Sequence, residues 1–196
     1  MTKTRELDHE ATGPLKGVRI VDLTSVVFGA YATQMLGDLG ADVIKVEFPG
    51  GRRGAGGDIM RWAGHAPEGA PEDLGPIFMT INRNKRSVLL DLREPKAMEA
   101  LRALVKTADV FAASVRYDGL TRLGLDYESV KAVRPDIVYV HGCGYGSDGP
   151  YAGEPAYDDL IQSASGLAGL LPYTDAQWDQ FFERSEEHTS ELQSRS

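Results

Sequence analysis

The chain has 196 residues and a formal net charge of −8 at pH 7, which suits one folded core and argues against nonspecific binding of nucleic acid. Its hydrophobic share of 42% and charged share of 26% are ordinary for a globular protein, and no apolar run approaches the roughly 18 residues of a membrane span. The single cysteine, Cys143, excludes an internal disulfide and favours a reducing cytoplasm.

The first predicted elements follow a polar lead-in, residues 1–13, which we expect to be disordered and which lacks the apolar core of a signal peptide. A strand, a helix and a second strand are predicted within Gly17–Glu47. The runs Val18–Leu23 and Val43–Val46 are typical of strands buried on both faces. Between them apolar residues recur at helical spacing, and Gly40 stands where a helix C-terminal cap belongs. This is a parallel, right-handed crossover, whose ligands bind at the carboxyl ends of the strands.

Two segments follow those strand ends, Thr24–Gly29 and Phe48–Asp58, and they are the first candidates for a binding site. The second opens a Gly/Pro-rich stretch that runs to Pro76, and loops of that length are usually functional or disordered. Local basic clusters decide whether a phosphate-bearing ligand binds, despite the negative net charge. Two such clusters are Arg52, Arg53 and Arg61, and Arg83, Lys85 and Arg86.

Strands and helices alternate through the rest of the chain. The predicted strands are Ser87–Leu90, Asp109–Ala113 and Ile137–His141. The predicted helices are Pro95–Lys106, Tyr127–Val133 and Tyr157–Leu170, with a glycine-rich loop at Gly142–Glu154. The alternation predicts an α/β fold with a Rossmann-like, doubly wound, mainly parallel sheet.

Common catalytic motifs are incomplete in this chain. Gly144–Gly149 satisfies G-x-G-x-x-G, but no helix opens directly after it, so a dinucleotide fingerprint is not favoured. Gly50–Asp58 lacks the Lys-Ser/Thr of a P-loop, and no set of residues has metal-ligand spacing. We expect Cys143 to be a buried thiol rather than a nucleophile. Asp158 and Asp159 fit a helix N-cap and first-turn acid, or a carboxylate that faces a cleft.

Six ordered segments together resemble the family III CoA-transferases, the family of formyl-CoA and carnitine-CoA transferases. They are Gly17–Glu47, Ile81–Asp91 (INRNKRSVLLD), Ala108–Val110, Leu120–Glu128 (LTRLGLDYE), Pro135–Tyr151 and Pro155–Leu167. The resemblance implies that residues 14–172 are the N-terminal part of the family's large domain, incomplete here, and that residues 173–183 are its truncated continuation.

The resemblance implies an enzyme that moves CoA between an acyl-CoA and a free carboxylic acid, through a mixed anhydride and an aspartyl-CoA thioester. CoA and acyl-CoA are then substrates, with no permanently bound cofactor and no metal. A carboxylate is a weak nucleophile, so this chemistry depends on positioning and desolvation. The implied partners are small molecules, and the full-length parent is implied to be an intertwined homodimer; the exclusion of nucleic acid and membrane and the cytoplasmic location rest on the composition given above.

The resemblance also assigns site residues by position. Those implied to contact CoA are Val26, Val27 and Phe28 on the thioester arm, Leu90 on adenine, Ser114, Val115 and Arg116 in the next wall, and Arg122 on a phosphate. Tyr157 matches an active-site tyrosine, and Asp158 is its neighbour.

The chain departs from the family at several of these places. Val27 replaces the glutamine of the formyl-CoA enzyme, which argues against oxalate-type substrates, and Phe48 stands where some members have an arginine on the nucleotide. Ser114–Asp118 replaces the usual Asn-Phe-Arg-Pro-Gly.

The end of the chain, residues 184–196, reads as an in-frame translation of a sequencing adapter, and we predict that it is an artefact. The family's nucleophilic aspartate falls in register with residues 186–188, so we expect it to be missing and the fragment to be inactive. Two alternatives stay open: an α-methylacyl-CoA racemase-like enzyme, whose histidine is Tyr157 here, and a non-catalytic CoA-binding fragment.

Overall fold

The computed structural model describes residues 12–50, 56–65 and 68–170. These residues form two units, one ending at Cys143 and one beginning at Gly144, and each is described by itself. Of the predicted lead-in, residues 1–11 lie outside the described residues. The segments 173–183 and 184–196, with the register expected for the nucleophile, lie outside them as well.

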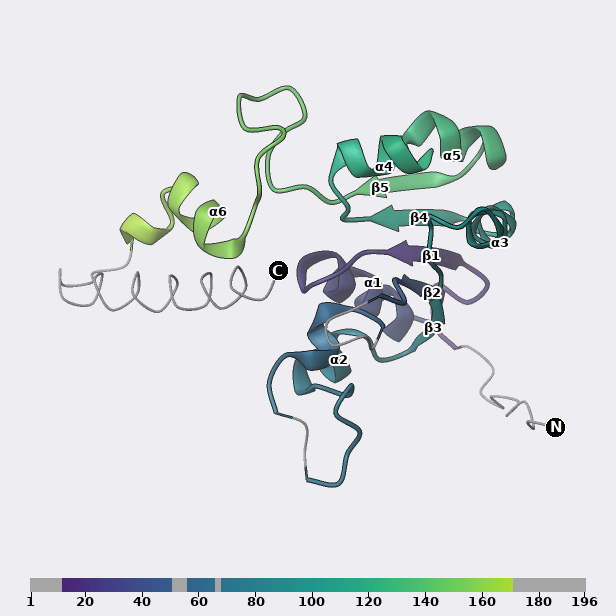
Figure 1. Ribbon diagram of the computed structural model, residues 1–196, viewed down its shortest axis with the longest axis horizontal. Helices are drawn as coiled ribbons and strands as arrows, with labels where there is room; N and C mark the ends of the chain where they lie inside the picture. Colours follow the sequence, from purple (N-terminus) through teal and green to yellow (C-terminus); the bar gives the residue numbers. More distant parts are fainter. Residues whose placement is uncertain (1–11, 51–55, 66–67, 171–196) are drawn as a thin grey trace. The chain divides into compact units, whose positions relative to one another are not determined.

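The first unit is built on a five-stranded sheet in the order β3-β2-β1-β4-β5 (Figure 1). All four pairs of neighbouring strands are parallel. The strands are β1 (Arg19–Leu23), β2 (Asp42–Glu47), β3 (Lys85–Leu89), β4 (Val110–Ala113) and β5 (Val138–His141). The chain adds β2 and β3 on one side of β1 and then returns to the other side of β1 for β4 and β5. The sheet is therefore doubly wound, which confirms the predicted fold class.

Helices cover both faces of this sheet. On one face lie α1 (Phe28–Asp38), the short 3-10 helix η2 (Ile59–Trp62) and α2 (Pro76–Ile81); on the other lie α3 (Pro95–Lys106), α4 (Tyr117–Leu123) and α5 (Tyr127–Val133). This division follows from right-handed crossovers that run outward from β1 in both directions.

Each face of the sheet has its own hydrophobic cluster, because successive strand residues point to opposite sides. Val21 and Phe111 belong to the larger cluster, which includes Leu101 of α3. Ile20 and Ala112 belong to the smaller cluster, which is packed by α1 and the segments beside it. The core therefore lies mainly between the sheet and α3, α4 and α5.

The predicted helix ends are confirmed where a cap residue marks them. Gly40 follows α1 with φ +100°, and a Cβ on it would lie 2.2 Å from the carbonyl oxygen of Thr12, so only glycine fits. Pro95 stands in the first turn of α3. Asp126 caps α5 by accepting the backbone N–H of Ser129 at 3.1 Å.

The second unit shows that one predicted helix was too long. The helix expected over Tyr157–Leu170 is α6 (Asp158–Ala164), followed by the 3-10 helix η3 (Ala168–Leu170). The break comes at Gly166, whose φ of +76° interrupts the helical backbone. The apolar spacing continued past this residue, and spacing alone does not reveal a backbone break.

Three short helices were missed in the first unit. Both η2 and α2 lie where the long loop was predicted or at its end, and α4 begins within the segment Ser114–Asp118 that departs from the family pattern. The helices η2 and α2 have four and six residues, too few turns for a periodic signal. Within the described part of the chain, no helix has the length and apolar character needed to cross a membrane.

Candidate functional site

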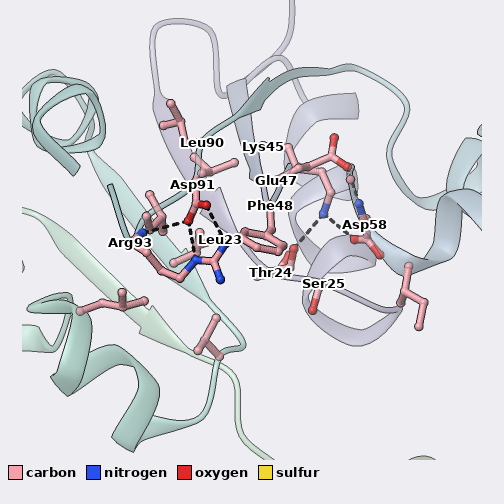
Figure 2. A pocket seen from close by; sticks show the side chains of 16 residues that line it. Leu23, Thr24, Ser25, Lys45, Glu47, Phe48, Asp58, Leu90, Asp91 and Arg93 are labelled. Atoms are coloured by element: carbon pink, nitrogen blue, oxygen red, sulfur yellow. Dashed lines mark hydrogen bonds and ion pairs between the residues drawn. The ribbon is translucent and has the colours of Figure 1, made fainter. Parts of the chain in front are cut away.

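A cavity of about 390 Å³ lies at the carboxyl ends of β1, β2 and β3 (Figure 2). Both segments selected from the sequence contribute to it: Thr24 and Ser25 from the first, and Phe48, Gly57 and Asp58 from the second. The remaining lining residues are Leu23, Lys45, Val46, Glu47, Ile59, Leu90, Asp91, Leu92, Arg93, Val115 and Leu123. The cavity therefore stands at the edge where parallel α/β sheets bind their ligands.

Lys45 supplies a buried cation at one side of this cavity. Its side chain is 1% exposed, as is that of Asp58, and the two form an ion pair at 2.8 Å. The Lys45 ammonium also donates to the carbonyl oxygen of Thr24 at 2.8 Å, and Figure 2 shows it extended toward both partners. Asp58 in turn caps η2 through the N–H of Met60. Because a buried charge is stable only when paired, this pair fixes η2 to β2.

Glu47, two residues further along β2, makes a second link to the same short helix. Its carboxylate accepts two hydrogen bonds from Arg61, at 2.8 and 2.7 Å, and one from the N–H of Asp58 at 2.6 Å. The Ser87 hydroxyl donates a fourth. Burial alone would raise the pKa of Glu47, but these hydrogen bonds, led by those of Arg61, lower it to about 2. The carboxylate is ionised, and its oxygens are occupied within the protein.

Lys85 and Asp22 make the third buried pair, deeper under α1. The Lys85 ammonium lies 3.0 Å from the Asp22 carboxylate and also donates to the carbonyl oxygen of Ala30 and to Thr33 and Asn82. Burial lowers the pKa of Lys85, and Asp22 opposes that shift. This pair joins β1 and β3 to the start of α1.

These contacts correct the interpretation of the basic clusters as phosphate-binding groups. Arg61 and Lys85 are paired with Glu47 and Asp22 inside the fold, and Arg83 and Arg86 pair with Asp38 and Asp42. None of these four lines the cavity. The other two members, Arg52 and Arg53, lie outside the described residues. Spacing showed the positive charges but not the carboxylates that the fold brings to them.

Arg93 is an exposed basic side chain at the cavity that, like Lys45, the sequence analysis did not name. It follows β3, is 72% exposed, and pairs with Asp91 through two hydrogen bonds of 2.8 and 2.7 Å. Its guanidinium lies 4.8 Å from the centre of the Phe48 ring, a cation–π contact visible in Figure 2. Its position directly after a predicted strand was the available signal.

The structure brings some residues assigned by resemblance to the cavity and leaves others beside it. Leu90 and Val115 line it. Ser114 touches its edge, since its hydroxyl accepts the N–H of Ser25 at 3.0 Å. The run Val26–Phe28 follows Ser25 but is exposed and is not among the lining residues.

Arg116 and Arg122 line a separate shallow hollow at α4, which shares Val115 with the cavity. The roles assigned to these residues and to those at the cavity remain predictions.

The remaining candidates lie at the end of the first unit or in the second. Cys143 is exposed, so the expected buried thiol was wrong. In the second unit Tyr157 is the N-cap residue of α6, and Asp158 and Asp159 are first-turn acids. Asp158 accepts a hydrogen bond from Gln162 at 2.6 Å. Tyr157 and Asp158 remain predicted active-site neighbours.

The geometry also disfavours a dinucleotide site. In dinucleotide-binding sheets an acid at the end of the second strand binds ribose, but Glu47 is committed to Arg61, Ser87 and Asp58. Within residues 12–50, 56–65 and 68–170, no group of three or more His, Cys, Asp and Glu side chains is arranged to hold a metal ion.

Comparison with known proteins gives a consistent result. The sequence model of the family described as "CoA-transferase family III" matches residues 15–178. The succinate–glutarate CoA-transferase of Agrobacterium fabrum is 41% identical over 166 residues, which are 84% of this chain and 40% of that protein. The human succinyl-CoA:glutarate CoA-transferase is 39% identical over 79% of this chain and 33% of its own length.

A solved structure shares the fold as well. A CAIB/BAIF family protein from Brucella suis superposes with a TM-score of 0.70 and 40% identity, covering 79% of this chain and 39% of that one. The chain thus spans about two fifths or less of the length of the relatives it matches.

The low pKa of Glu47 predicts acid sensitivity. Because its folded-state pKa of about 2 lies below the ordinary value of 4.5, its stabilising effect is complete above pH 4.5 and is lost as pH falls toward 2. We expect the free energy of unfolding, measured by urea titration at pH 7, 5 and 3, to fall less with decreasing pH in Glu47→Gln than in the unmodified chain. In the control variant Asp136→Asn, which changes an exposed carboxylate, the free energy of unfolding should fall with pH as steeply as in the unmodified chain. An equally steep fall in Glu47→Gln would contradict the low pKa assigned to Glu47.

Breaking the Lys45–Asp58 pair should be costly. Lys45→Met leaves the Asp58 carboxylate buried without its partner, which should lower the free energy of unfolding by about 3–5 kcal/mol. The double variant Lys45→Met/Asp58→Asn should recover part of this loss. As a control, Arg83→Met breaks the more exposed pair with Asp38 and should cost less than about 1 kcal/mol in the same urea titration. Equal losses in the two single variants would refute the distinction.

Proposed function

The chain belongs to CoA-transferase family III, and from this premise we propose that the protein moves CoA between an acyl-CoA and a free carboxylic acid. The observation that carries the proposal is the continuous family match over residues 15–178, at about 40% identity to named CoA-transferases. Because the chain covers only part of those relatives, the activity is proposed for the whole protein.

The cavity at the ends of β1, β2 and β3 is the place we propose for CoA. Its wall is largely apolar, with Leu23, Phe48 and Leu90 among its residues, and such surfaces suit an adenine ring and a pantetheine chain. Arg93 at its edge uses Nε and one Nη2 proton for Asp91, and its Nη1 and other Nη2 donors can bind phosphate oxygens. Together these features match a ligand with an apolar body and several phosphates.

The proposed chemistry begins with an aspartate carboxylate that attacks the thioester carbonyl of the acyl-CoA. The C–S bond breaks, CoA leaves as thiolate, and a mixed anhydride forms. The thiolate then attacks the aspartyl carbonyl, which releases the donor acid and leaves an aspartyl-CoA thioester. The acceptor carboxylate repeats the two steps in reverse order, so CoA passes to the acceptor and the aspartate is regenerated.

For the acids we propose dicarboxylates of the size of succinate and glutarate. The support is the naming of relatives at 41% and 39% identity for these acids. Val27, where the formyl-CoA enzyme has glutamine, supports the same choice over oxalate. We further propose an intertwined homodimer and a cytoplasmic location, the latter supported by the single cysteine.

CoA binding by the chain is predicted to depend on Arg93. Arg93→Ala should raise the Kd for CoA about tenfold in isothermal titration calorimetry, since it removes a charge-assisted contact to phosphate. Arg86→Ala is the matched control: it removes an arginine ion-paired with Asp42 at the opposite end of β3, and it should leave the Kd unchanged. Equal weakening by both variants would show that only the general charge matters.

The activity is tested on the complete product of the gene. Incubation with succinyl-CoA and glutarate should yield glutaryl-CoA and succinate in equal amounts, measured by liquid chromatography. Exchange of the α-proton of a 2-methylacyl-CoA for deuterium, without CoA transfer, would instead support the racemase alternative. CoA binding without either reaction would support the non-catalytic reading.

A further inference from the structure

Val26 has a backbone conformation that its residue type disfavours. Its φ is +62°, in the left-handed region, and among the described residues the other non-glycine with positive φ is Asn84. Asparagine tolerates this region, but a β-branched valine there is a genuine outlier. Strain of this kind persists only where the surroundings impose it, and it gathers at functional sites.

The strained residue lies in the turn Thr24–Val27, which joins β1 to α1 and is held from three strands. The Asp22 carboxylate on β1 accepts both the N–H and the hydroxyl of Thr24, at 2.9 and 2.5 Å. Lys45 on β2 donates to the Thr24 carbonyl oxygen at 2.8 Å. Ser114, directly after β4, accepts the N–H of Ser25 at 3.0 Å. Each contact acts on the two residues before Val26.

The three contacts differ in how firmly they are anchored. Asp22 and Lys45 are buried and have further ion-pair partners, so the Thr24 side of the turn is fixed by the core. Ser114 is half-buried and provides the contact nearest to Val26. It is therefore the contact on which the strained conformation depends most directly.

We propose that Ser114 is a positioning residue: it holds the strained turn so that Ser25 stays in the wall of the CoA cavity. This rests on the function proposed above, and it assigns Ser114 a role through the turn instead of a contact with CoA. With the turn held beforehand, CoA does not have to order it on binding. Without the Ser114 hydroxyl, the strain at Val26 is released by a change in the turn, and the cavity wall is lost.

The proposal predicts a specific suppression between two positions. Ser114→Ala should raise the Kd for CoA about fivefold in isothermal titration calorimetry. In a Val26→Gly background the same change should raise it less than twofold, because glycine adopts φ +62° without strain and the turn no longer needs the clamp. In a Val26→Ala background Ser114→Ala should still raise the Kd about fivefold. Alanine lacks the two methyl groups of valine, but its Cβ still disfavours positive φ.

Either of two results would overturn the proposal. Equal sensitivity to Ser114→Ala in the glycine and alanine backgrounds would mean that Ser114 acts by direct contact with CoA. No effect of Ser114→Ala in the unmodified chain would mean that it has no role in binding.

A second measurement separates this inference from the proposed function. Hydrogen exchange of the Tyr31 amide, which donates to the Val27 carbonyl oxygen at 2.8 Å on the far side of the strained residue, reports the turn without any ligand. It should be at least tenfold faster in Ser114→Ala and return to the unmodified rate in Val26→Gly/Ser114→Ala. If the unmodified chain binds no CoA, the CoA site proposed for the cavity fails, and this exchange measurement still tests the clamp. Unchanged Tyr31 exchange would refute the clamp whatever the binding data show.

Discussion

Three buried ion pairs on one face of the sheet are the constraint on which the rest of the structure depends. Asp22–Lys85, Lys45–Asp58 and Glu47–Arg61 lie under α1 and η2, on the first three strands. A buried charge without its partner is costly, so each strand register and the approach of η2 must satisfy all three at once. Along β2, Lys45 presents a cation and Glu47 an anion. Their partners are Asp58, which caps η2, and Arg61 within it. Any other alignment of η2 on β2 would bring like charges together.

The opposite face of the same strands is apolar. There Val21, Val46 and Phe111 pack against α3 and its neighbours in an apolar cluster. The apolar side provides most of the hydrophobic free energy of folding, and the polar side provides geometric definition. The cavity begins where the polar face reaches the strand ends. Lys45 and Asp58 belong both to the ion-pair network and to the lining, so the ion pairs also fix the position of the cavity wall.

Prediction from the sequence succeeded where a periodic pattern carried the information. The unit β1-α1-β2 was predicted because buried parallel strands and an amphipathic helix leave distinct periods, and Gly40 marks a turn that only glycine can make. The short helices η2 and α2 span too few turns to show a period. At the site, Leu90 and Val115 came from the family pattern. Partner choice was beyond reach, because the carboxylates that neutralise Arg61 and Lys85 are set by the fold, not by neighbours in sequence.

The two strand ends also disfavour a dinucleotide at this edge of the sheet, where we propose that CoA binds. A dinucleotide site needs glycines after the first strand and a free acid after the second. Here Glu47, the acid of β2, is consumed by Arg61 and the N–H of Asp58, and the turn after β1 carries valines instead of glycines. A valine held at positive φ brings bulk to a turn where a pyrophosphate would need open backbone. The strain at Val26 is therefore consistent with the apolar ligand proposed for this edge, since such a ligand is contacted by side chains and the conformation of this one is disfavoured for valine.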